Sequence, residues 1–112
     1  MYGLAVDRME VKESDWKLFR KMVQVWQERL CDRFVQKYSD LLGGNEPSGE
    51  KFWKLEKMIR KDSTAPGMII DMRRSQMLLN LVALMRAGVI REDELESFSG
   101  ELREAVMHLT GR

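Results

Sequence analysis

The sequence predicts an all-α fold, a small helical bundle of about four helices in which the first helix is much the longest. The main observation is a stripe of apolar residues at steps of three and four along one predicted helix, from about Ser14 to Leu42. The stripe consists of Trp16, Phe19, Val23, Trp26, Leu30, Phe34, Tyr38 and Leu41. A shorter stripe near the C-terminus repeats this spacing, and glycines and prolines fall mostly at junctions. With 112 residues, 44% hydrophobic and 33% charged, the chain suits a single globular domain.

The domain is expected to cover residues 13–112, after an N-terminal lead of residues 1–12. We expect this lead to be flexible, although weak apolar alternation in its sequence leaves open that it pairs with a neighbouring chain. Ser14 is the expected N-cap of the long helix, because its hydroxyl can accept a hydrogen bond from a free backbone N–H in the first turn. Gly43 and Gly44 are expected to end that helix.

Two further helices are expected in the middle of the chain. Ser48 is the expected cap of a helix over residues 49–61. After a break rich in turn-forming residues, a third helix is expected to begin near Thr64 and to run to about Ala87. An interruption near Ser75, with this serine capping the second part, is left open.

The C-terminal third supplies partners for the long helix. Residues 77–85 are apolar around most of the helical circumference, which predicts a central, buried helix. A last helix is expected over residues 92–109. Its stripe consists of Leu95, Phe98, Leu102, Val106 and Leu109. Gly100 follows Ser99 in its middle and costs about 1 kcal/mol relative to alanine, so this helix is expected to kink or split there.

The first helix is longer than the globule that the other helices can build. About 29 residues at about 1.5 Å each extend roughly 43 Å, whereas a compact domain of this size has a diameter of roughly 34 Å. Either the ends of the helix project, or a second copy covers the surplus of the stripe. Because the run from Trp16 to Leu30 is spaced like a heptad repeat, we predict a homodimer that shares this helix, with an elongated monomer as the alternative.

Six short segments carry a resemblance to a group of proteins. They are SDWKLFR at 14–20, FWKLE at 52–56, PG at 66–67, RSQM at 74–77, GVI at 88–90 and DELESFS at 93–99. Over about residues 11–106 the chain resembles short, uncharacterised bacterial proteins that are often labelled multidrug transporters. The resemblance implies a small, all-helical fold, and it transfers no catalytic or binding residue to this chain. The transport label is not expected to hold, because no apolar run approaches the roughly 20 residues that cross a bilayer.

Catalytic and metal-binding patterns are weak in this chain. Cys31 and His108 are the only cysteine and histidine, and we expect Cys31 beside the first stripe and His108 opposite the last one. Glu104 lies one turn from His108, but a metal site needs more ligands than two. The sequence therefore predicts no catalytic residue, no metal and no cofactor. A single cysteine also favours a reducing cytoplasm.

Basic residues are concentrated in one region although the net charge is only +1. The candidate basic patch consists of Lys51, Lys54, Lys57, Lys61, Arg73 and Arg74. It offers nucleic-acid contact as an alternative function, although a lysine face is common on solvated helices. A DNA-reading helix-turn-helix is not expected, because residues 91–94 would bring three carboxylates to the phosphate backbone. The acidic segment over residues 92–104 is expected to complement the basic one, within the bundle or across a dimer.

Two apolar residues are expected on polar helix faces. Trp53 points away from the cluster that Phe52, Leu55 and Ile59 form on the same helix, and Val25 lies off the stripe of the first helix. Exposed tryptophans are enriched at binding hot spots. We therefore predict that Trp53 and Val25 belong to a surface for another protein, with cover by a neighbouring helix as the alternative for Trp53.

Taken together, these patterns predict a cytoplasmic, non-enzymatic protein–protein interaction module, an adaptor or regulator. It is expected to self-associate through its long amphipathic helix and to contact a further, unidentified protein. Nucleic-acid binding through the basic patch is the alternative function, and no membrane contact is expected. A small enzyme that uses carboxylates of residues 92–104 is the least favoured class.

Overall fold

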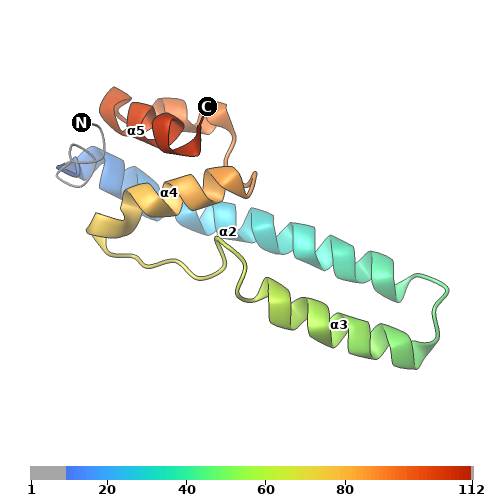
Figure 1. Cartoon of the computed structure of the whole chain (residues 1–112). Helices are drawn as coiled ribbons and strands as arrows, with labels where there is room; N and C mark the ends of the chain where they lie inside the picture. The colour runs from blue at the N-terminus through green and yellow to red at the C-terminus, as the bar shows by residue number, and fades with distance from the viewer. Residues whose placement is uncertain (1–9, 112) are drawn as a thin grey trace.

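The computed structural model describes residues 10–111, so most of the predicted lead, residues 1–12, lies outside the described residues. Within that range the elements are α2 (Glu13–Leu42), α3 (Ser48–Asp62), η1 (Arg74–Gln76), α4 (Met77–Arg86), η2 (Glu92–Ser97) and α5 (Gly100–Thr110) (Figure 1). The elements η1 and η2 are short 3-10 helices, and the others are α-helices. The described part contains no strand, which confirms the all-α prediction with one long first helix.

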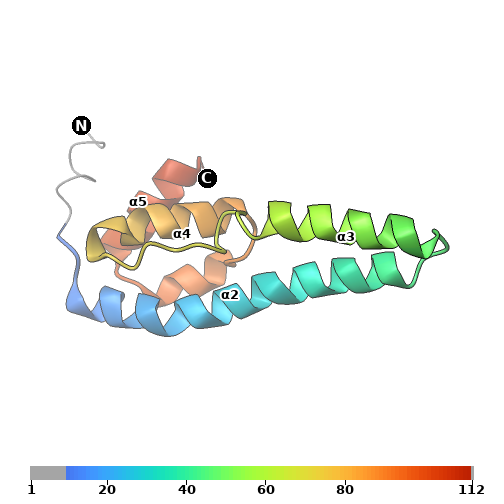
Figure 2. The same ribbon diagram turned by 90° about the horizontal axis from the view of Figure 1, so that it is seen from below.

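Helix α2 runs the whole length of an elongated molecule, and different elements pack on its two halves. The molecule measures 55 × 25 × 23 Å, and its radius of gyration is 17.2 Å, where a compact domain of this size has about 13 Å. In Figures 1 and 2, α4, η2 and α5 lie against the N-terminal half of α2, whereas α3 runs back along its C-terminal half. We call the first part the core, and residues 31–42 together with α3 the arm.

The core is built on the N-terminal half of the apolar stripe. The five stripe residues from Trp16 to Leu30 are each 8% exposed or less. Trp26 stacks on Phe98 with ring centroids 6.4 Å apart, so the segment between η2 and α5 covers the middle of this half. The buried residues of α4 are Met77, Leu78, Leu81, Val82, Leu84 and Met85. This confirms a central α4, although Leu79 is 56% exposed and one side of its apolar circumference therefore faces solvent.

A polar contact ties the start of α2 to the start of α5. Asp15 is buried, and its carboxylate accepts hydrogen bonds from the backbone N–H of Ser99 at 2.8 Å and from its Oγ at 2.6 Å. The buried carboxylate is tolerated because both of its oxygens have a donor. Ser99 Oγ in turn accepts from the N–H of Leu102 at 3.3 Å and caps α5. The predicted last helix is therefore split at Ser99, into η2 and α5.

Glu94 joins η2 to the middle of α2. Its carboxylate accepts hydrogen bonds from Arg29 Nη1 at 2.6 Å, from Trp26 Nε1 at 3.3 Å and from the N–H of Arg91 at 3.0 Å. The bond from Arg29 holds the pKa of Glu94 at about 2, well below its usual range, although burial opposes this. Arg29 also donates to the carbonyl of Val89 at 2.7 Å. An acidic residue of the C-terminal segment thus complements a basic residue of α2 within one chain.

Both predicted N-caps are misplaced. Ser14 lies inside the first turn of α2, because the carbonyl of Lys12 already accepts the first helical hydrogen bond, at 3.0 Å. Ser48 is the first residue of α3, and Pro47 occupies the capping position before it. The fixed φ of proline suits the start of a helix, where its missing N–H costs nothing.

The largest correction concerns residues 63–73, which form a non-helical strap of turns followed by irregular backbone, where the first turns of a helix from Thr64 were expected. Gly67 sets the course of the strap, because its φ of +95° favours glycine. A Cβ at this position would lie 2.7 Å from Leu84 Cδ2 and 3.1 Å from Leu30 Cδ2. Tight packing between α2 and α4 therefore decides the backbone here and overrides the helical spacing of the apolar residues. Helical structure resumes only with η1.

Candidate functional site

Polar contacts hold the two helices of the arm together. Tyr38 Oη donates a 2.6 Å hydrogen bond to Asp62, and Lys37 Nζ lies 2.7 Å from the same carboxylate. At the other end of the arm, Lys51 Nζ donates to the carbonyl of Leu42 at 2.8 Å. Burial and the bond to Asp62 raise the pKa of Tyr38 to about 12. Burial also opposes the ionisation of Asp62, but the hydrogen bonds from Lys37 and Tyr38 outweigh it and lower the pKa of that carboxyl.

The arm presents large apolar side chains to solvent. These side chains, which we call the arm face, are Val35, Leu42, Phe52 and Ile59, each between 47% and 63% exposed. A hollow of about 380 Å³ lies beside Phe52, Leu55 and Ile59. The predicted cluster on α3 therefore exists, but only Leu55 among its three members is half-buried. The reason is that α3 packs on one helix and does not reach the core.

Helical geometry places the four side chains of the arm face on the same side of the arm. The two on α2 come three residues before and four after Tyr38, which lies on the contact line with α3. The two on α3 come three residues before and four after Leu55. Two antiparallel helices are related by a two-fold axis perpendicular to the plane that contains both helix axes. Residues at the same sequence offset from the contact line therefore lie on the same side of that plane in both helices. The arm is therefore a two-helix layer with one apolar side.

Only the C-terminal part of the predicted self-association stripe is accessible to another molecule. Phe34, Tyr38 and Leu41 are half-buried in the arm. The five residues from Trp16 to Leu30 are buried within the single chain and present almost no surface to a second copy, so self-association through the stripe stays a prediction for Phe34, Tyr38 and Leu41. The physical reason is that α4, η2 and α5 of the same chain already cover this half of α2.

Trp53 and Val25, the predicted partner surface, are both exposed but belong to different parts of the molecule. Trp53 is 64% exposed, and its indole meets the Phe52 ring edge-on with centroids 5.0 Å apart. It precedes Leu55 by two residues, which directs it away from α2. Val25 lies on the core half of α2, beside Glu28. Trp53 lies beside the C-terminal end of α2, about 20 Å along the helix axis from Val25. The two residues therefore do not form one surface.

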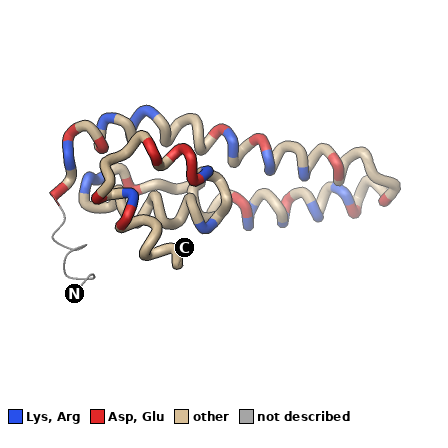
Figure 3. Tube along the Cα trace, turned by 90° about the horizontal axis from the view of Figure 1, so that it is seen from above, with Lys and Arg blue, Asp and Glu red and all other residues tan. Residues whose placement is uncertain are grey.

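The lysines of the candidate basic patch are not equally available. Lys51 binds a backbone carbonyl, and Lys54 forms an ion pair with Glu46 that raises the pKa of Lys54. Lys57 and Lys61 are exposed. Figure 3 shows acidic residues interspersed with basic ones along both helices of the arm. The α3 part of the patch therefore offers two lysines, Lys57 and Lys61, that have neither an ion pair nor a hydrogen bond of the side chain among the described residues.

The arginines of the candidate patch lie at the core end of the molecule and are paired. Arg73 Nε lies 2.9 Å from Asp71 Oδ2, and Arg74 Nη2 lies 2.7 Å from Glu13. The guanidinium of Arg74 also covers the ring of Trp16, at 5.6 Å from its centroid. The structure therefore does not bring the six predicted residues together into one basic surface.

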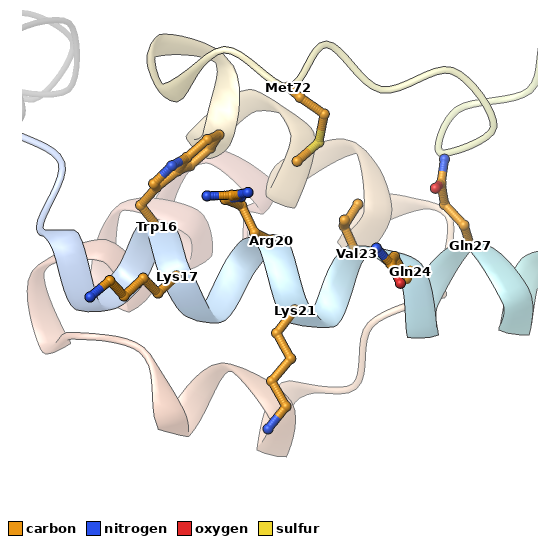
Figure 4. Close-up of a pocket in the computed structure, with 8 residues that line it drawn as sticks. All are labelled: Trp16, Lys17, Arg20, Lys21, Val23, Gln24, Gln27 and Met72. Atoms are coloured by element: carbon orange, nitrogen blue, oxygen red, sulfur yellow. The ribbon is translucent and has the colours of Figure 1, made fainter.

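A groove of about 730 Å³ lies between the core half of α2 and the strap (Figure 4). Its lining consists of Trp16, Lys17, Arg20, Lys21, Val23, Gln24, Gln27 and Met72. Ligand sites commonly have volumes of about 300–1,000 Å³. The groove is therefore large enough to receive side chains of another molecule.

Apolar and cationic groups are arranged at different depths in this groove. In Figure 4, Trp16, Arg20 and Val23 rise from α2 toward the side of the strap, from which Met72 reaches down. Lys21 points the opposite way and lies at the outer rim. Trp16 and Val23 are largely buried, whereas Arg20 and Met72 are exposed. The groove therefore combines an apolar floor with a guanidinium directly beside it.

One end of the groove is closed by a polar contact. Gln27 Nε2 donates to the carbonyls of Gly67 at 3.2 Å and Met68 at 3.3 Å, so the side chain joins α2 to the strap. The groove was not predicted from the sequence, because the strap was expected to be helical. A signal was present, since Lys17, Arg20, Gln24 and Gln27 recur at steps of three, four and three beside the apolar stripe.

The residues considered for catalysis lie in different environments. Cys31 is half-buried with its Sγ 4.0 Å from Met68 Sδ, whereas His108 and Glu104 are exposed on α5. Within residues 10–111, no group of three or more His, Cys, Asp or Glu side chains is placed to hold a metal ion. Among the described helices, none combines the length and the apolar character that a membrane crossing requires.

Comparisons with protein-family models, with curated proteins and with solved structures gave no match to this chain. The function proposed below therefore rests on the chain's own geometry.

Proposed function

We propose that this chain is a cytoplasmic, non-enzymatic protein–protein interaction module that self-associates through its arm. The arm faces of two copies pack against each other in the proposed dimer. The observation that carries the proposal is the arm face itself, four large apolar side chains on one side of a two-helix layer. Two such layers packed together make a four-helix arrangement in which each apolar side is covered.

A second copy of the chain suits this surface for two reasons. Members of the arm face on the same helix are seven residues, or about two turns, apart. The side chains of two identical arm faces therefore have the same spacing and can interdigitate. The net charge of +1 gives little repulsion between copies. At the edge of the arm face, Arg60 forms an ion pair with Glu56, so no charge of a single sign opposes contact there.

The size of the arm face predicts a weak dimer. The 15 residues of α3 extend about 22 Å, and two helices side by side are about 20 Å wide. Each copy therefore offers roughly 440 Å², compared with about 800 Å² per partner in an interface of standard size. We expect the dimer to dissociate on dilution through the micromolar range.

Analytical ultracentrifugation over a range of concentrations tests this proposal. The mass of the wild type is expected to rise from that of the 13.2 kDa monomer toward twice this value. Phe52→Asp and Ile59→Asp are each expected to stay monomeric with an unchanged circular dichroism spectrum, because a carboxylate in the interface loses its hydration. Ile69→Asp is the matched control, since Ile69 is 76% exposed but lies on the strap. A wild type that stays monomeric up to about 1 mM, or an equal effect of Ile69→Asp, contradicts the proposal.

Nucleic-acid binding is the second candidate function, and the exposure of Lys57 and Lys61 is the observation that favours it. It has less support, because the other four residues of the basic patch already contact carboxylates or a backbone carbonyl. Salt-sensitive retention on heparin that disappears when Lys57 and Lys61 are both changed to Glu would favour this alternative.

A further inference from the structure

We infer that the groove between α2 and the strap binds an acidic, amphipathic peptide segment of a partner protein. An apolar side chain of the peptide lies between Trp16 and Met72, and a neighbouring carboxylate binds Arg20. The groove occupies the core half of α2, whereas the arm face lies on the other half. The inference therefore goes beyond self-association and does not depend on it.

The floor of the groove explains the apolar part of the ligand. Trp16 and Val23 form this floor, and Met72 reaches over it from the strap with 42% of its surface exposed (Figure 4). Methionine side chains adapt their shape to an apolar partner. A leucine or phenylalanine side chain placed beside Met72 removes apolar surface of both molecules from water.

The cations of the groove explain the acidic part of the ligand. Arg20 is exposed at the edge of the floor and forms no ion pair with the described residues. Lys17, one turn earlier on α2, is also exposed and unpaired among these residues. Arg74, by contrast, is paired with Glu13 at the end of the groove. A guanidinium beside apolar surface binds a carboxylate through two parallel hydrogen bonds, so Arg20 selects an acidic residue next to an apolar one.

The backbone of the strap favours an extended peptide over other anions. Residues 70–73 of the strap belong to no helix or turn, and the N–H groups of Ile70, Asp71 and Met72 donate no hydrogen bond to the described residues. An extended peptide that runs along the strap can pair with such backbone groups, as when a strand is added to a sheet edge. A nucleic-acid backbone needs several cations in a row, but Arg73 is already paired with Asp71. The charges therefore fit one or two carboxylates and not a phosphate chain.

Fluorescence anisotropy with two labelled octapeptides tests the inference on the full chain. One peptide alternates Glu and Leu, and the other alternates Lys and Leu. The wild type is expected to bind only the Glu-Leu peptide, and Arg20→Glu is expected to weaken that binding at least about tenfold, or about 1.4 kcal/mol. Met72→Ala is expected to weaken it as well, through the apolar contact. Arg103→Glu makes the same change of charge on an exposed position of α5 and is expected to leave binding unchanged.

Four outcomes overturn the inference. They are no binding of the Glu-Leu peptide to the wild type up to about 1 mM, equal binding of both peptides, equal losses in Arg20→Glu and Arg103→Glu, and tighter binding of a twelve-nucleotide oligo(dT) that Arg20→Glu abolishes. Phe52→Asp separates this site from the arm, because it is expected to leave peptide binding intact while it removes the dimer. Loss of peptide binding in Phe52→Asp but not in Arg20→Glu is a fifth outcome that overturns the inference, because it would place the peptide on the arm face.

Discussion

Replacement of Glu94 by glutamine probes the strongest electrostatic contact of the core. The carboxylate is only 10% exposed and is bound by Arg29 and by the indole N–H of Trp26. These contacts lower its pKa from the ordinary value of 4.5 to about 2. At about 1.4 kcal/mol for each pKa unit, the difference corresponds to about 3 kcal/mol. Because glutamine imitates the protonated acid, we expect Glu94→Gln to reduce the free energy of unfolding at pH 7 by about this amount, a large fraction of the stability of such a domain.

The pH dependence follows from the direction of the pKa change. Since folding lowers the pKa of Glu94, its contribution is present above the pKa of the unfolded chain and is lost as the pH falls from about 5 to about 2. The wild type and Glu94→Gln should therefore reach similar stability near pH 2. Asp62, whose pKa is also lowered, loses its contribution in both proteins alike and cancels from the difference.

Urea unfolding followed by circular dichroism at several pH values measures these quantities. Glu104→Gln is the matched control, because Glu104 is exposed on α5 and we expect its removal to change stability very little. If Glu94→Gln costs no more than Glu104→Gln at pH 7, the assignment of the contact as stabilising is wrong. A difference between wild type and Glu94→Gln that stays constant down to pH 2 would equally refute the linkage to ionisation.

Two further substitutions test the packing of the core. Gly67→Ala is expected to lower the free energy of unfolding by about 2 kcal/mol or more, because the added Cβ clashes with Leu84 and the positive φ disfavours alanine. Gly111→Ala is the control, since its φ is +78° but its Cβ would lie in open space. Thermal unfolding should show a distinctly smaller loss of stability for this control. Asp15→Ala is expected to cost about 2 kcal/mol in urea unfolding, since it leaves the Ser99 donors unpaired. Asp15→Asn keeps one acceptor, so its stability should lie between those of wild type and Asp15→Ala. If Asp15→Ala is as stable as wild type, the contact with Ser99 does not hold α5 in place.

Periodicity in the sequence was sufficient to predict α2 and the side on which its apolar residues lie, but not which half is covered. Leu30 and Phe34 follow the same spacing, yet Leu30 is buried and Phe34 only half-buried. The reason is length, because the 10 residues of α4 and the 11 of α5 extend only about 15 and 17 Å. Which part of the apolar stripe is buried depends on the lengths of the helices that pack on α2. The spacing of residues within α2 gives no information about those lengths.

The strap and the groove show a second limit of sequence patterns. Met68, Ile69 and Met72 have a spacing that fits a helix, but the backbone there forms a turn followed by irregular structure. The deciding contact is the close approach of Gly67 to side chains of two other helices, which exists only in the assembled core. The spacing of Lys17, Arg20, Gln24 and Gln27 marks one polar side of α2, but it does not contain the strap that turns this side into a groove.

The partners of the two halves of α2 lie at very different separations along the chain, which matters while the protein is being synthesised. Tyr38 and Asp62 in the arm are 24 residues apart, whereas Asp15 and Ser99 in the core are 84 residues apart. Contacts between nearby residues need less loop closure, so the arm can form once α3 has left the ribosome. Residues 16–30 must wait for the last third of the chain. Until then their apolar side chains are open to aggregation and to chaperones.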